Sequence, residues 1–266
     1  MSDSLPQPAI APDTYTERYF LEACAGHELW AQSGGRELDP RYAGTLELAQ
    51  LAPGETLVDV GCGRGELLVA ALAAGAASAI GVEYAAAAIE LARRTIDAHS
   101  AGARARVLHA DARALPLADG EADLVTMLDI VEHLAPDELD RALREALRVL
   151  RPGGRLLVHT LPNRLIYDVT YRLQRRAWPP RWRAWPRDPR NAYEHDMHVN
   201  EQRVGSLRRA LRRAGFDAVR VRTGDWIHDE FVPDPRARRL YRRLAAHRLT
   251  ASLGAADIWG HGRRGR

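Results

Sequence analysis

Between residues 56 and 160 the sequence alternates short apolar runs with segments of helical periodicity, and this alternation constrains the fold more than any other feature. Runs such as Thr56–Val60 and Arg155–Thr160 are short and rich in Val and Leu, which suits strands buried on both faces. Strands that alternate with helices pair in parallel, because each connection crosses over the sheet. We therefore expect an α/β fold with a doubly wound, mostly parallel sheet.

The expected elements fall into four segments. The first, 1–44, holds a loose tail over 1–13, an amphipathic helix over 14–31 and the start of a second helix over 39–51. The second, 45–160, is the core, with expected strands at 56–60, 78–82, 105–110, 122–128 and 155–160 and helices at 66–74, 85–98 and 137–150. The third, 161–200, departs from the alternation and is interpreted as an inserted substrate cap. The fourth, 201–266, returns to the core sheet, with a helix over 201–214, a strand over 217–222, a basic helix over 234–250 and a last edge strand over 255–262.

Composition limits the partners and the compartment. The 266 residues hold no apolar run of about 18 residues and no signal-peptide pattern at the N-terminus, so we expect a cytoplasmic chain without a transmembrane helix. The only cysteines, Cys24 and Cys62, fit neither a zinc template nor a disulfide framework. Every basic residue is Arg, and the net charge is −12 over 1–150 and +15 over 151–266. The basic half either faces nucleic acid, a phosphorylated substrate or an anionic membrane, or forms solvated helix faces.

A glycine-rich turn follows the first expected strand, in the sequence Val-Asp-Val-Gly-Cys-Gly-Arg-Gly at 58–65. Gly61 permits a tight turn, and Gly63 lets a ligand approach the backbone. A dinucleotide site favours G-x-G-x-x-G, whereas here the third glycine comes one residue early. Asp59 stands just before the turn, where a carboxylate repels a diphosphate but suits a cation. This charge logic favours S-adenosylmethionine, with its amino group and sulfonium, over NAD.

Acidic residues also follow the next three expected strands. Glu83 comes about 20 residues after the glycines, where a carboxylate can accept both ribose hydroxyls. Asp111 and Ala112 follow the third strand, within reach of an adenine amino group, and Asp129 follows the fourth. Any one of these acids could instead cap a helix or a turn. Four acids at the ligand-binding edge of one sheet favour a binding site.

With these motifs the sequence resembles class I S-adenosylmethionine-dependent methyltransferases. The resemblance covers roughly 45–160 and rests on the motifs at 58–65, 81–93, 109–125 and 150–158. It implies a Rossmann-like, seven-stranded sheet with a reversed final strand, and an N-terminal helical lid in which Tyr15 and Tyr19 either contact the cofactor or simply pack. The cofactor-binding residues it implies are Tyr19, Asp59, Gly61, Cys62, Gly63, Glu83, Tyr84, Asp111, Ala112 and Asp129.

The acceptor side is expected after the fourth strand and after the insertion. His133 and His198 are the candidate catalytic residues, while His159 inside a strand is expected to pack. The spacing of Asp129, Glu132 and His133 resembles two groups of metal-dependent O-methyltransferases, those of ubiquinone biosynthesis and those that modify small RNAs. That resemblance implies a divalent metal, Mg²⁺ for example, held by these three residues and His198. Asp129 stands where those groups have Glu, and its side chain is one methylene shorter. In many metal-free members of the superfamily, the Glu-His pair instead lines the acceptor pocket or caps a helix.

The inserted segment contains interleaved Trp and Arg, Trp178 to Trp185, which either contact bases or a membrane interface or form a cap over the acceptor. We favour the cap. The function expected is therefore methylation of a small molecule, with oxygen favoured over nitrogen or carbon, by a monomer or homodimer. An RNA methyltransferase is the first alternative, although no RNA-binding module is recognisable, and a non-catalytic cofactor-binding subunit is the second.

Overall fold

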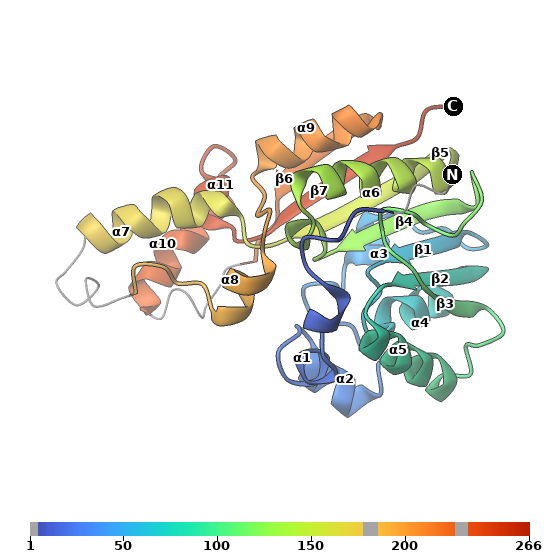
Figure 1. Ribbon diagram of the computed structural model, residues 1–266. Coiled ribbons are helices and arrows are strands. Elements are labelled where there is room, and N and C mark those ends of the chain that lie inside the picture. Colours follow the sequence, from blue (N-terminus) through green and yellow to red (C-terminus); the bar gives the residue numbers. More distant parts are fainter. Residues whose placement is uncertain (1–4, 178–185, 227–233) are drawn as a thin grey trace.

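The computed structural model describes residues 5–177, 186–226 and 234–266, and seven strands in it form one sheet (Figure 1). The strands are β1 (Thr56–Val60), β2 (Ser78–Glu83), β3 (Ala105–His109), β4 (Ala122–Leu128), β5 (Leu150–Thr160), β6 (Asp217–Thr223) and β7 (Ile258–Arg263). Their order is β3-β2-β1-β4-β5-β7-β6, and β7 is antiparallel to both of its neighbours while the other pairs are parallel. The expected α/β fold with a seven-stranded, mostly parallel sheet is confirmed.

Helices cover both faces of the sheet. One face packs α6 (Pro136–Val149) and α9 (Val204–Ala214) on Val58, Val60 and their neighbours. The other packs α3 (Thr45–Leu48), α4 (Glu66–Ala73) and α5 (Ala86–Ala98), with Leu57 among the buried side chains. The alternation of Leu57 and Val58 between the two faces is the two-residue period of a strand. Burial on both faces leaves the strand ends as the place where ligands can reach the sheet.

The C-terminal strands differ from the expectation. The segment 255–262 was expected at the edge of the sheet, but β7 lies between β5 and β6, and β6 is the edge strand. Because β7 runs antiparallel, the chain can return from β6 and insert beside β5. The strand β5 begins at Leu150 rather than at 155, since Leu150 already pairs with Ala122 across a register shift.

The N-terminal segment is more broken than its periodicity predicts. In place of one helix over 14–31 there are η1 (Pro12–Thr14), α1 (Glu17–Glu22) and α2 (His27–Ser33). Gly26 has a left-handed backbone, with φ of 75°. Arg64 donates to the carbonyls of Phe20 and Ala25, which a continuous helix would use in its own hydrogen bonds. The helix predicted over 39–51 is reduced to α3, because Asp39 turns the chain by accepting from the Arg41 backbone.

Four further helices form a lobe beyond β6 and β7, away from α5 (Figure 1). They are η3 (Ile166–Tyr171), α7 (Arg172–Ala177), α10 (Pro235–Ala246) and α11 (Ala251–Gly254), with Tyr167 and Tyr241 in a small core of their own. The helix predicted over 234–250 ends at Ala246 and resumes as α11. The Trp/Arg stretch at 178–185 lies outside the described residues. Within the described chain, no helix has the length and apolar character needed to span a membrane.

Candidate active site

A cavity of about 710 Å³ opens at the carboxyl ends of the parallel strands. Its walls come from the ends of β1, β2 and β4, from the N-terminal segments, and from α8 (Ala192–Met197) and the residues around it. All ten predicted cofactor-binding residues line it: Tyr19, Asp59, Gly61, Cys62, Gly63, Glu83, Tyr84, Asp111, Ala112 and Asp129. The side chains of Glu132, His133 and His198 line the same cavity. One hollow therefore brings together the predicted cofactor and acceptor residues.

The glycine-rich turn places bare backbone on the cavity wall. Gly61 has φ of 77°, and a side chain there would overlap Ile130. Gly63 has φ of 51°, and no heavy atom lies within 4 Å of where its Cβ would be. Its N–H donates to Glu83 Oε2 at 3.1 Å. The turn thus gives a ligand access to main-chain atoms that any side chain would obstruct.

Two buried carboxylates border this turn. Glu83 accepts hydrogen bonds from the N–H groups of Tyr84 and Ala85, and burial raises its pKa. Asp59 accepts from the Thr126 hydroxyl at 2.7 Å, and burial raises the pKa of Asp59 to about 7. Within 5–177, 186–226 and 234–266, no basic side chain forms an ion pair with either acid. A cationic or hydroxyl-bearing ligand would satisfy both groups better than an anion.

Asp111 differs from these two acids because its carboxylate is already paired. Arg113 binds both oxygens of Asp111, and its Nη1 also donates to Glu138. Glu138 in turn accepts from the backbone of Ala9 at 2.9 Å, and the Tyr84 hydroxyl donates to the carbonyl of Ile10. The N-terminal segment is therefore fastened across this side of the cavity.

His133 sits where this segment meets the chain after β4. The Tyr15 hydroxyl lies 3.0 Å from His133 Nδ1, and the ring of His198 lies 5.0 Å from the His133 ring, edge on. Burial, together with the charge on His198, lowers the pKa of His133 to about 3. The imidazole of His133 is thus neutral at pH 7, and with this pKa it is a weak base that takes a proton only from a strongly acidic group.

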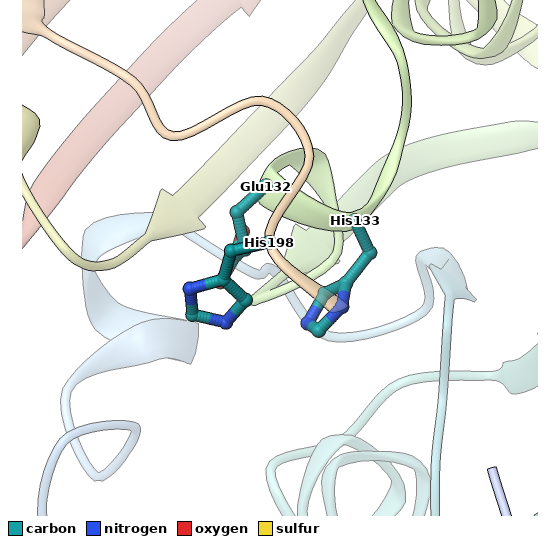
Figure 2. Close-up of side chains that lie close together, drawn as sticks. All are labelled: Glu132, His133 and His198. Carbon is teal, nitrogen blue, oxygen red and sulfur yellow. The ribbon is translucent and has the colours of Figure 1, made fainter. Parts of the chain in front are cut away.

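The structure brings three of the four predicted metal ligands together. One ligand atom each from Glu132, His133 and His198 lies within 4.8 Å of the others, and Figure 2 shows these side chains converging from two segments. Burial and the nearby Asp129 raise the pKa of Glu132 to about 7, and its Oε2 accepts from Thr160. Two imidazoles and one carboxylate do not fit Mg²⁺, which prefers oxygen ligands; such a set suits a transition ion.

Asp129 lies apart from this cluster. It follows β4 with φ of 52°, outside the short helix η2 (Val131–His133), so the spacing of Asp129, Glu132 and His133 does not place them on one helical turn. Its carboxylate accepts from the Tyr42 hydroxyl and lies 2.5 Å from His159 Nδ1. Arg41 is 3.5 Å away. These contacts outweigh burial and hold the pKa of Asp129 below its usual value.

His159 is packed inside β5, as expected, but it carries charge. Burial opposes its protonation, yet Asp129 on one side and Asp257 on the other raise the pKa of His159 to about 9. Asp257 Oδ2 lies 3.4 Å from His159 Nε2 and also accepts from the Trp259 indole. This network links β4, β5 and β7 to Tyr42. No motif marks Tyr42 or Asp257, so sequence reasoning could not have found it.

Aromatic side chains that the sequence did not single out form the rest of the wall. Tyr193 of α8 packs 5.6 Å from Tyr19, between ring centres. The Arg41 guanidinium lies over the rings of Tyr42 and Trp226, at 5.3 and 5.7 Å. All five residues border the cavity. Flat apolar surfaces with a few polar groups among them are typical of small-molecule sites.

Comparisons with known proteins agree with this geometry. Residues 57–154 match the family model described as a methyltransferase domain. The chain is 30% identical over 230 residues to a malonyl-(acyl-carrier protein) O-methyltransferase of Methylococcus capsulatus, covering 82% of this chain and 74% of that one. It is 30% identical to a ubiquinone/menaquinone biosynthesis C-methyltransferase of Dinoroseobacter shibae, covering 74% and 75%. Among solved structures, the cyclase SpnF superposes with a TM-score of 0.64 over 98% of this chain and 99% of that one, at 18% identity.

The chain therefore belongs to the class I S-adenosylmethionine-dependent methyltransferases. It is an enzyme of that class, and S-adenosylmethionine is the cofactor that the class implies. The relatives include both O- and C-methyltransferases, so membership does not name the methylated atom.

Proposed function

We propose that the enzyme transfers the methyl group of S-adenosylmethionine to a hydroxyl oxygen of an uncharged, ring-containing small molecule. The observation that carries the proposal is His133, a neutral imidazole at the cavity wall between Tyr15 and His198. Methylation turns the hydroxyl into a strongly acidic oxonium, and even a weakly basic neutral imidazole can accept its proton.

The cofactor half of the site supports one orientation of S-adenosylmethionine. The adenosine would lie along the ends of β2 and β3, with its ribose hydroxyls on Glu83 and its adenine beside Asp111 and Ala112. The methionyl amino group would approach Asp59 and the backbone at Gly63, because Asp59 is a buried acid without a basic partner among the described residues. Tyr19, Cys62 and Tyr84 would complete the walls, and Asp129 would border the cofactor from the acceptor half.

The charges on the wall support an uncharged acceptor. Ten carboxyl side chains and three arginines line the cavity. The arginines are already paired: Arg41 with Asp39, Arg64 with Glu66, and Arg113 with Asp111. Among the described residues, an anionic acceptor would face the remaining carboxylates without an unpaired arginine, which disfavours a carboxylate or a phosphodiester. Tyr19, Tyr42, Tyr193 and Trp226 supply flat apolar surfaces for a ring.

The reaction needs alignment more than covalent help. S-adenosylmethionine, when bound, would supply the methyl group: the acceptor oxygen would bond to the methyl carbon as the bond from that carbon to sulfur breaks, and S-adenosylhomocysteine, with an uncharged sulfur, would be left. The hydroxyl proton would pass to Nε2 of His133, while Nδ1–H donates to the Tyr15 hydroxyl and this contact fixes the ring orientation. The charge of Asp129 would favour the protonated imidazole. No step passes through a metal.

Acceptor screening with a matched set tests the proposal. Purified enzyme and S-adenosylmethionine are incubated with a phenol, the corresponding aryl carboxylate and the corresponding aniline, and products are identified by mass spectrometry. We expect methyl ether from the phenol, and His133→Gln should lower its rate of formation about 10²- to 10⁴-fold. Affinity for S-adenosylhomocysteine should stay within about threefold, because His133 acts on the acceptor.

The control variant is His109→Gln, at an exposed histidine beyond the acceptor half. It should keep the full rate. Methylation of carbon or of the carboxylate in preference to the hydroxyl would contradict O-methylation. An unchanged rate for His133→Gln would contradict the role of His133.

A further inference from the structure

Helix α10 presents a row of arginines that have no ion-pair partner among the described residues. Arg236, Arg239 and Arg243 are exposed and share one face, since they are spaced three and four residues apart. The opposite face buries Ala237 and Tyr241 against η3. Neither these three arginines nor the exposed Arg242 and Arg248 form an ion pair with any residue the structure describes. A row of unpaired positive charge is costly in self-repulsion and is relieved by an anionic surface.

The same lobe also exposes leucines. Leu240 flanks the arginine row and is 37% exposed, and Leu249, in the turn after α10, is 78% exposed. Leu173 on α7 is 60% exposed. Leu249 and Leu173 are the two most exposed large apolar side chains among the described residues. We call Arg236, Arg239, Leu240, Arg242, Arg243, Arg248 and Leu249 the α10 face.

Helix α9 shows that arginine content alone does not explain this arrangement. It is also amphipathic and also carries four arginines, Arg208, Arg209, Arg212 and Arg213. Two of them have partners, since Arg213 pairs with Asp140 and Arg208 donates to the carbonyl of Val221. No large apolar side chain of α9 is exposed. The α10 face therefore combines unpaired cations with exposed apolar groups, whereas α9 is an ordinary solvated helix.

We propose that the α10 face docks the enzyme on an anionic lipid bilayer. Arginines along one helix face attract acidic headgroups, and leucines at the flank and at the end of the helix can enter the apolar boundary beneath them. An acidic protein would satisfy the arginines, but it would cover Leu249 only if it carried an apolar pocket at the matching place, whereas a bilayer offers an apolar layer along its whole surface. Because α10, α7 and α11 stand together at one end of the molecule (Figure 1), a bilayer can reach them without contacting α5 or the far edge of the sheet.

Vesicle co-sedimentation of the full chain tests the proposal without any acceptor, so its outcome is independent of the proposed reaction. Vesicles of phosphatidylcholine alone are compared with vesicles containing phosphatidylglycerol, at low and at physiological salt. We expect binding only to the anionic vesicles, weakened by salt. The double variant Arg239→Glu/Arg243→Glu should lower the affinity at least about thirtyfold, and Leu249→Ser about tenfold.

The matched control is Arg209→Glu/Arg212→Glu on α9, which makes the same change of charge at exposed positions. It should lose less than about threefold, and every variant should keep wild-type affinity for S-adenosylhomocysteine. Failure of the wild type to bind anionic vesicles would overturn the proposal, as would an equal loss in the α9 control. Binding to soluble polyglutamate as tight as to vesicles, and insensitive to Leu249→Ser, would overturn the assignment to lipid in favour of an acidic protein.

Discussion

The two halves of the cavity are built in different ways. The cofactor half consists of the turns directly after β1, β2 and β3, so its residues lie within a few positions of a strand end. Its contacts are largely with the backbone, as in the hydrogen bonds from Gly63, Tyr84 and Ala85 to Glu83. The acceptor half joins the N-terminal segment, the chain after β4 and α8, and it is held by side chains, as between Tyr15 and His133.

This difference explains why the sequence identifies the class of enzyme but does not identify the acceptor. Backbone geometry at a strand end requires glycines and acids at fixed spacing, so it leaves a local pattern in the sequence. Contacts between Tyr42, Asp129 and His159 join segments 30 and 87 residues apart and need no fixed spacing. The cofactor half should therefore be sensitive to backbone changes, and the acceptor half to loss of individual side chains.

The largest effect on cofactor binding is expected at the glycine-rich turn. Gly61→Val places a β-branched residue at φ of 77° and drives its side chain into Ile130, so the turn must move. Affinity for S-adenosylhomocysteine, measured by calorimetric titration, should fall at least about a hundredfold, the equivalent of about 2.7 kcal/mol. Gly54→Val is the control, because Gly54 also has positive φ but lies in open space outside the cavity. Equal affinity of the two variants would refute the backbone account of this half.

We expect removal of the His159 side chain to destabilise the acceptor half. His159→Phe leaves Asp129 and Asp257 buried without their shared cation, and loss of one partner of a buried pair costs about 3–5 kcal/mol. Urea unfolding at pH 6.5 should show a loss of that order, while His261→Phe on β7, where the structure gives no such pair, should cost less than about 1 kcal/mol. A wild-type midpoint for His159→Phe would show that the network does not hold this half together.

The contacts of His159 with Asp129 and Asp257 also predict how the free energy of unfolding depends on pH. Because the pKa of His159 is raised to about 9 from 6.5, its contribution is fully present below pH 6.5 and is lost as pH rises through 9. The difference in unfolding free energy between wild type and His159→Phe should therefore shrink between pH 6.5 and 10. A constant difference would mean that His159 is neutral in the folded protein.

A smaller effect, on cofactor affinity, is expected from the ionisation of Asp59. Burial raises its pKa to about 7, so it is largely protonated at pH 5.5 and largely ionised at pH 7.5. If it binds the cofactor's amino group, affinity for S-adenosylhomocysteine should rise roughly tenfold across this range in the wild type. In Asp59→Asn the affinity should be lower and nearly independent of pH. A parallel rise in both proteins would exclude Asp59 as the cation's partner.

The smallest effect is expected from metal removal. The donors at Glu132, His133 and His198 do not suit Mg²⁺, and Tyr15 already engages one nitrogen of His133. Dialysis against EDTA, or addition of Mg²⁺, should change the rate of methyl transfer by less than about twofold. Loss of activity restored by Mn²⁺ or Zn²⁺ would instead identify these three residues as a metal site.

The core strands and the cofactor half could be predicted from the sequence because both depend on residues that lie close together in the chain. Sequence reasoning predicted β1 and β4 residue for residue, and every cofactor residue it named borders the cavity. It failed where distant contacts override local preference. Arg64 interrupts the helix predicted over 14–31, and the antiparallel return of β7 moves β6 to the edge. Asp129 was grouped with Glu132 by spacing, but Tyr42 and His159 draw its carboxylate away.

The central claim is that the carboxyl-end turns bind S-adenosylmethionine independently of the acceptor half. It is tested most directly by calorimetric titration of S-adenosylhomocysteine into wild type, Glu83→Gln and His133→Gln. The account predicts binding at one site in the wild type, a loss of about tenfold or more in Glu83→Gln through its ribose and backbone contacts, and near wild-type affinity in His133→Gln. No binding by folded wild type, or equal losses in the two variants, would contradict it.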